Sequence, residues 1–345
     1  MIARRRARPL PVLVILTGLL GFSAVAGVAV GSVAVDPRTA GAVLLRAAGV
    51  PVAVTWPPET AAIILVLRLP RVILAGVVGM SLAGAGTVFQ GLFRNPLADP
   101  YIIGVSAGAA LGATMTIVRG GGAGPATIGT VPIAAFLGAL AASYGVYRLA
   151  RRNSDVPMED LLLAGVAIGA FLSAIISLMQ LAGGESLQRV IFWVMGGFAG
   201  RTWAHIGMAA PYAAVGLLVA WLYGRDLNVL QVGEEGALLL GVDVPRVKRI
   251  LLACGSLMAA AAVATSGLIG FVGLVTPHLM RLVVGPDHRV LLPAAALAGA
   301  VTLVLADLLA RTVVTPGEIP VGVVTALLGA PFFLYLLLRG RRPTA

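Results

Sequence analysis

Residues 250–280 read ILLACGSLMAAAAVATSGLIGFVGLVTPHLM, a run of 31 residues without a formal charge. A helix rises about 1.5 Å per residue, so about 20 apolar residues cross a hydrocarbon core of about 30 Å. The run is too long for one crossing and short for two. Its middle, residues 266–273, is SGLIGFVG, and such glycines suit a tight turn. We therefore expect two short spans, at 250–266 and 268–285, with Arg281 reaching to the membrane surface.

The same pattern, long apolar runs bounded by charges, recurs along the whole chain of 345 residues. Hydrophobic residues make up 59% and charged residues 11% of the sequence, whereas a soluble domain carries about 25% charged residues. The pattern predicts an all-α, polytopic membrane protein of about ten transmembrane helices, with residues 1–345 forming one transmembrane domain. The other eight predicted spans are 10–35, 72–93, 101–118, 125–147, 161–184, 202–224, 290–310 and 319–338.

The positions of the 25 Lys and Arg residues predict the orientation of the spans. Positive residues gather on the cytoplasmic side of a membrane. Ten spans place most of these residues, and both termini, on that side. The longest loops are then 36–71 outside and 225–249 inside. The first apolar run exceeds the roughly 7–15 residues of a signal-peptide core, so we expect an uncleaved span there.

Several function classes lack their sequence signatures here. The only Lys, Lys248, follows Val247, whereas the lysine of a phosphate loop directly follows a glycine. A single Cys, Cys254, excludes an internal disulfide framework and a cysteine-based metal cluster. The spans also carry few ionisable residues, which disfavours an ion-driven carrier; Asp307 and Arg311 instead predict a local ion pair. We expect no catalysis and no cofactor or metal bound by this chain. Because it lacks a phosphate loop, any energy from ATP must be supplied by a partner protein.

Small residues recur at every fourth position in some spans, which favours close helix packing in a membrane. The residues predicted to serve this role are Gly104, Gly108 and Gly112 in one span, and Gly165 and Gly169 in another.

Three stretches together resemble a known family. The first is LRLPR at 67–71, followed by QGLFRNPLADP at 90–100. The second is GFVGLVTPH at 270–278, and the third is ADLLAR at 306–311 with EIPVGVVTALLGAPFF at 318–333. They are similar to the permease subunits of bacterial ABC importers for iron-siderophores, haem and cobalamin, the FecCD family. The NPLADP segment is by its own chemistry a turn, because proline blocks a helix and Asn and Asp bond locally.

The resemblance implies a type II ABC importer permease fold in the bacterial inner membrane. It implies a homodimer or a paired homologous permease, two cytoplasmic ABC ATPase subunits that use ATP and magnesium, and an external substrate-binding protein. The implied function is import of a metal chelate. Iron(III)-siderophore is favoured on base rate, with haem and cobalamin close behind. A stand-alone secondary transporter and a purely structural membrane protein are the alternatives.

The resemblance also implies two contact sites. Arg68, Arg71 and Arg311 match arginines that meet acidic residues of the binding protein, and arginine suits carboxylates; simple interfacial anchoring is the alternative. The cytoplasmic loop resembles the coupling helix that contacts the ATPase, with a surface-lying helix as the alternative. Three adjacent leucines cannot share one face, so we expect some of them to contact protein. The coupling residues are Gly233, Glu234, Glu235, Leu238, Leu239, Leu240, Gly241 and Val242.

Overall fold

The computed structural model describes residues 9–31, 33, 35–120, 129–152, 156–314 and 317–340. Within these residues all regular elements are helices, which confirms the predicted all-α class. The apolar helices are α1 (Pro9–Ala29), α4 (Leu69–Leu92), α5 (Val105–Val118), α6 (Thr130–Ala150), α7 (Met158–Ala182), α9 (Trp203–Leu222), α12 (Val244–Ser266), α13 (Val272–Val284), α14 (His288–Ala310) and α15 (Val321–Gly340).

Among the described residues, seven helices are long and apolar enough to cross a membrane, and α5, α13 and α15 are shorter apolar helices. Together they correspond to the predicted set of ten. The predicted single domain over the whole chain stays a prediction. Short elements join the apolar helices: α2 (Pro37–Ala47), α3 (Pro58–Ala62), the π-helical η1 (Ile63–Arg68), the 3₁₀ turn η2 (Gly184–Ser186), α8 (Leu187–Met195), α10 (Gly224–Leu230) and α11 (Glu234–Leu239).

The run at 250–280 is divided, as its glycines predict. α12 ends at Ser266, and α13 starts at Val272, four residues after the predicted start of the span. The intervening segment contains Gly267 at φ +72° and Phe271 at φ +67°. Its backbone is tied to another loop, because the hydroxyl of Tyr101 donates to the carbonyl of Ile269 at 2.9 Å.

The limits of the first two predicted spans differ from the structure. The second span was expected at 72–93, but a continuous helix begins at Pro58 and includes η1 and α4. The first was expected at 10–35, but α1 ends at Ala29. Both differences have one cause, since the arginine of η1 lies inside the protein and binds the end of α1, as shown below.

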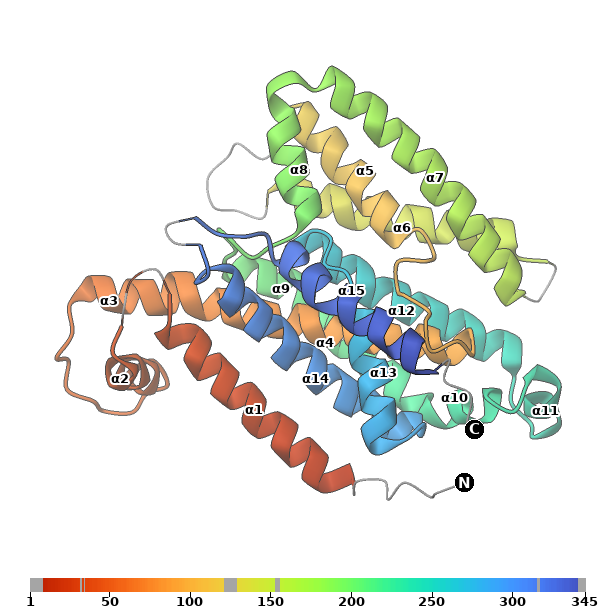
Figure 1. Cartoon of the computed structure of the whole chain (residues 1–345), viewed down its shortest axis with the longest axis horizontal. Helices are drawn as coiled ribbons and strands as arrows, with labels where there is room; N and C mark the ends of the chain where they lie inside the picture. The colour runs from red at the N-terminus through yellow and green to blue at the C-terminus, as the bar shows by residue number, and fades with distance from the viewer. Residues whose placement is uncertain are drawn as a thin grey trace.

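α4 and α14 form the centre of the bundle (Figure 1). α4 also packs on α9, α12 and α13. At the α4–α14 crossing, a Cβ added to Gly79 would clash with the backbone carbonyl of Gly299. Two helices can approach this closely only where both lack a side chain, as is common in membrane bundles.

The bundle has two distinct ends. The start of α1 and the end of α15 lie on the same side of Figure 1 as α10 and α11, and we call this the α11 end. α2, α3 and α8 lie on the opposite side, which we call the α2 end. The candidate sites occupy these two ends.

Candidate functional site

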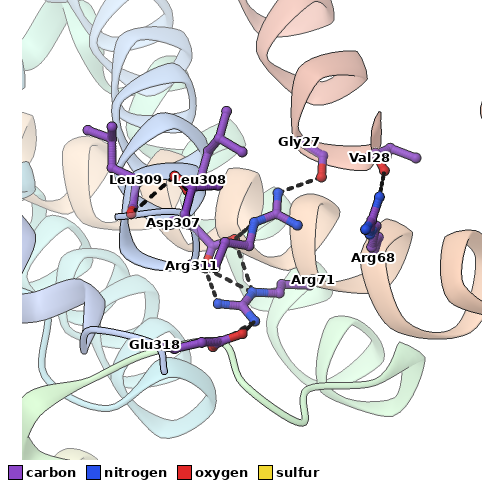
Figure 2. A network of polar contacts seen from close by, with 10 residues as sticks. Gly27, Val28, Arg68, Arg71, Asp307, Leu308, Leu309, Arg311 and Glu318 are labelled. Atoms are coloured by element: carbon purple, nitrogen blue, oxygen red, sulfur yellow. Dashed lines mark hydrogen bonds and ion pairs between the residues drawn. The ribbon is translucent and has the colours of Figure 1, made fainter. Parts of the chain in front are cut away.

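Two arginines at the α2 end cap the last turn of α1 (Figure 2). Arg68 donates from one terminal nitrogen to the carbonyls of Val28 at 2.9 Å and Ala29 at 2.8 Å. Arg311 donates to the carbonyl of Gly27 at 2.5 Å. The last carbonyls of a helix have no partner within the helix and carry partial negative charge. The guanidinium groups therefore satisfy acceptors that would otherwise be buried without a donor.

Arg71 joins α4 to α14 and to the segment before α15. Its Nε and one terminal nitrogen lie 2.8–3.0 Å from the carboxylate of Asp307, and its other terminal nitrogen lies 2.9 Å from Glu318. Asp307 is also 3.6 Å from Nε of Arg311, four residues later, which confirms the predicted local ion pair. Figure 2 shows Arg71 between the two carboxylates.

Burial limits what these arginines can offer to another protein. Arg68 and Arg311 are each 6% exposed, and each donates at least one hydrogen bond to a carbonyl at the end of α1. Arg71 is 11% exposed at its side chain. The docking role of these three residues stays a prediction, and Arg71 is the member of the set most open to a partner.

A hollow at the α2 end borders this cluster. It has a volume of about 570 Å³ and is lined by Arg71, Arg189, Arg201 and Glu318 together with aromatic side chains such as Phe192. Its charged residues come from α4, α8 and the segments that precede α9 and α15. No sequence pattern groups these residues, because they are far apart in the chain.

At the α11 end, α11 has the limits that its sequence predicts. Its first turn carries Glu234 and Glu235, which suits the positive N-terminus of a helix. After the helix, Gly241 adopts φ +83° and its amide donates to the carbonyl of Leu238, while the amide of Val242 donates to Ala237. This arrangement closes the helix in the manner of a left-handed glycine cap.

The three leucines after these glutamates all lie on the surface. Leu238 is 55%, Leu239 89% and Leu240 66% exposed. None of the three is buried within this chain, so the expectation that some of them contact protein stays a prediction about a partner. The neighbouring Val232 is exposed as well. A cluster of exposed apolar side chains with polar surroundings marks a surface that another protein can cover.

Lys248 holds α11 against the bundle. It is 2% exposed, and its Nζ lies 2.5 Å from the carboxylate of Glu234 and 3.3 Å from the carbonyl of Val156. The contacts join α12 to α11 and to the segment that leads into α7. Sequence reasoning used Lys248 only to exclude a phosphate loop, because nothing in the local sequence points to a partner 14 or 92 residues away.

A second polar contact fixes α10 to the start of α14. The side-chain amide of Asn228 donates to Asp287 at 2.7 Å, and the backbone amide of His288 donates to Asn228 at 2.9 Å. The hydrogen bond from Asn228 is the main reason that the pKa of Asp287 lies below its usual value. The loop at 225–249 is thus anchored on both sides, at α10 and at Lys248.

The predicted packing glycines have different surroundings. A Cβ on Gly108 would clash with the carbonyl of Gly138 in α6, and one on Gly112 with that of Ala134. One on Gly165 would clash with the carbonyl of Ile102. These positions therefore need glycine for close packing.

The other two predicted packing glycines, Gly104 and Gly169, are not in close contact with the backbone of another helix. Gly104 is the left-handed residue before α5, at φ +81°. Gly169 has open space around it, so none of the described residues is a packing partner that requires a glycine there. The NPLADP segment forms the expected local bonds, with Asn95 and Asp99 accepting from backbone amides two residues later.

The sequence of this chain is similar to a family of transport proteins and to named import permeases. A family model, the FecCD transport family, matches residues 18–339. The chain is 51% identical over 281 residues to the cobalamin import system permease protein BtuC of Halobacterium salinarum, covering 81% of this chain and 74% of that protein. It is 45% identical over 277 residues to the hemin transport system permease protein HmuU of Yersinia pestis, covering 80% and 83%.

The fold also matches a solved structure. That structure is described as an inward-facing conformation of a metal-chelate type ABC transporter. It superposes with a TM-score of 0.80 at 33% identity, over 95% of this chain and 99% of that chain. The sequence match and the shared helical bundle agree over nearly the full length, so this chain is a member of the FecCD transport family.

Proposed function

We propose that this chain is the permease subunit of an ATP-driven ABC importer. The observation that carries the proposal is the family match over residues 18–339, together with relatives named as import permeases. The sequence lacks a phosphate loop of its own, which fits a permease energised by separate ATPase subunits. In this proposal the α11 end is cytoplasmic, the α2 end faces outward, and the chain resides in the inner membrane as a dimer.

The substrate we propose is a metal chelate with a tetrapyrrole-type macrocycle, cobalamin or haem. This class is supported by the names of the two relatives above and by the Escherichia coli vitamin B12 import system permease, 42% identical over 277 residues. Iron(III)-siderophore, favoured from the sequence on base rate, has no such support among these relatives and becomes the second choice.

In this proposal the exposed leucines transmit movement from the ATPase to the permease. Leu238, Leu239 and Leu240 would enter a groove of the ATPase subunit. Lys248 then transmits displacement of α11 to the bundle, because its ammonium group binds α11 and the segment that leads into α7 at once. ATP-driven closure of the ATPase pair would reposition the two permease subunits as rigid bodies. Arg71, at the outward hollow, is our first candidate for contact with the external binding protein.

Purification of the tagged full chain from its native membranes tests the ATPase partner. We expect an ABC ATPase subunit to co-purify with the wild type. Leu239→Arg should lose it, because a charge replaces a side chain that is 89% exposed at the contact. Val313→Arg, also exposed but at the opposite end, is the matched control and should retain it. Equal recovery in both variants would refute the coupling surface.

Uptake by reconstituted vesicles tests the substrate and the alternative mechanism. We expect ATP-dependent uptake of cyanocobalamin or haemin once the ATPase and binding protein are present. Uptake of a ferric siderophore alone would overturn the macrocycle assignment. Vigorous uptake by this polypeptide alone, driven by an ion gradient, would instead establish the secondary transporter.

A further inference from the structure

An apolar groove lies between α6 and α12, near the α11 end and apart from both sites described above. Its volume is about 550 Å³. Buried side chains of Ile103, Leu161 and Leu252 line it, and the exposed side chains of Tyr144 and Arg249 lie at its edge. α6 and α12 contact one another and are both labelled in Figure 1. Hollows of roughly 300–1,000 Å³ hold small organic molecules.

One wall of the groove carries a buried hydroxyl without a partner. Ser143 is 7% exposed, and its Oγ has no hydrogen bond among the described residues. Serines in a helix commonly donate to the carbonyl four residues earlier, and Ser256, which also lines the groove, does so to Leu252 at 2.7 Å. A buried hydroxyl left unbonded is costly. The unpaired hydroxyl of Ser143 therefore indicates a ligand atom that accepts a hydrogen bond inside the groove.

The edge of the groove is basic. Arg249 is exposed, and its Nε donates to the carbonyl of Pro245 at 3.2 Å; among the described residues no acceptor binds its two terminal nitrogens. Arg148, also exposed, lies one turn beyond Tyr144 on α6. Tyrosine near the end of a membrane helix is typical of the lipid–water interface. Going inward from the membrane surface, the basic residues come first, then Tyr144, and then the apolar groove.

We propose that this groove binds an anionic glycerophospholipid of the leaflet at the α11 end. The phosphate lies at the guanidinium group of Arg249, which presents a planar fork of donors suited to phosphate oxygens. One acyl chain fills the apolar hollow, and an ester carbonyl accepts from Ser143. A fatty acid lacks that ester, and a zwitterionic lipid lacks the net charge that a basic edge attracts.

The basic charge at the edge also favours an anionic lipid in this groove over a second copy of the chain. In a twofold dimer formed through this face, Arg148 and Arg249 of one copy would approach the same residues of the other. Like charges brought together oppose such a contact. An anionic headgroup instead neutralises them. The lipid site is independent of the identity of the transported substrate.

Photo-crosslinking in vesicles of the full chain tests the site. Phosphatidylglycerol with a diazirine in one acyl chain should label the segment around Cys254, which lines the groove, several times more than phosphatidylcholine with the same acyl chain. Arg249→Gln should reduce labelling by phosphatidylglycerol about five-fold, the equivalent of about 1 kcal/mol for one basic residue near an anionic surface. Arg225→Gln, exposed on α10, is the matched control and should change nothing.

Two results would overturn the proposal. One is equal labelling by the two lipids, or labelling by phosphatidylglycerol that survives Arg249→Gln, since either indicates lipids without a specific site. The other is a link between two copies of Cys254, the only cysteine of the chain, by a short bifunctional thiol reagent in place of lipid labelling. Ser143→Ala should weaken labelling by phosphatidylglycerol without lowering the thermal midpoint. Unchanged labelling would show that no ester carbonyl of the lipid accepts a hydrogen bond from Ser143.

Discussion

Replacing Asp307 with Asn should strongly destabilise the protein. The Asp307 carboxylate is 1% exposed and lies 2.8 Å from Arg71 and 3.6 Å from Arg311. At about 3 Å and an effective dielectric constant near 20, a unit charge pair is worth about 5 kcal/mol. Asparagine keeps one acceptor, but Arg311 loses the counter-charge of Asp307, and Arg71 keeps only the counter-charge of Glu318, whose side chain is 41% exposed. Loss of one partner of a buried pair costs about 3–5 kcal/mol.

Glu318→Gln is the matched control, because Glu318 binds the same Arg71 but its side chain is 41% exposed. An exposed ion pair contributes about 0–1 kcal/mol. The assay is the apparent thermal midpoint of purified protein, followed by a dye that fluoresces on reaction with Cys254 as the bundle opens. At about 2 °C per kcal/mol, we expect a fall of about 6–10 °C for Asp307→Asn and at most about 2 °C for the control. Equal falls in both variants would refute the reasoning.

Three further predictions concern other parts of the bundle. Gly299→Ala should lower the thermal midpoint by several degrees, because its Cβ would clash with the α4 backbone, whereas Gly169→Ala should change it little in the open space around that residue; similar shifts in both would contradict the close-packing account. Lys248→Met should speed hydrogen exchange of amides 233–242 at least ten-fold, since α11 loses its 2.5 Å ion pair, and Arg225→Met serves as the exposed control. Arg68→Gln should expose the end of α1 to limited proteolysis even in the absence of any binding protein, because the carbonyls there lose a buried cationic donor; an unchanged digestion pattern would show that the cap is dispensable.

The sequence predicted the helices well because the length of a membrane span is a local property. Apolar runs between charges can be counted, and the division of residues 250–280 followed from glycines within the run itself. The Asp307–Arg311 pair was equally predictable, since residues four apart share a helix face. The limits of α11 followed for the same reason, from its glutamates and Gly241.

Contacts between distant segments could not be predicted in this way. Arg68 was expected outside the membrane because a lone charge is costly in a bilayer. Its partners are the carbonyls at the end of α1, some 40 residues earlier in the chain. Lys248 and Glu234 are separated by only 14 residues but belong to different helices, and no helical periodicity connects them. A buried charge can be interpreted only when its counter-charges are known, and those depend on the packing of the bundle.

The distribution of polar contacts indicates which helices must move together. α4 and α14 are joined twice, by the close backbone contact at Gly79 and Gly299 and by the ion pair of Arg71 and Asp307. Sliding one helix past the other would break a directional bidentate bond and drive one backbone into the other. Within the part of the chain that the structure describes, α7 has no such bond to α4 or α14, and much of its apolar surface is exposed. We therefore expect any movement that begins at α11 to leave the α4–α14 pair rigid and to act on α7, which Lys248 reaches through the carbonyl of Val156.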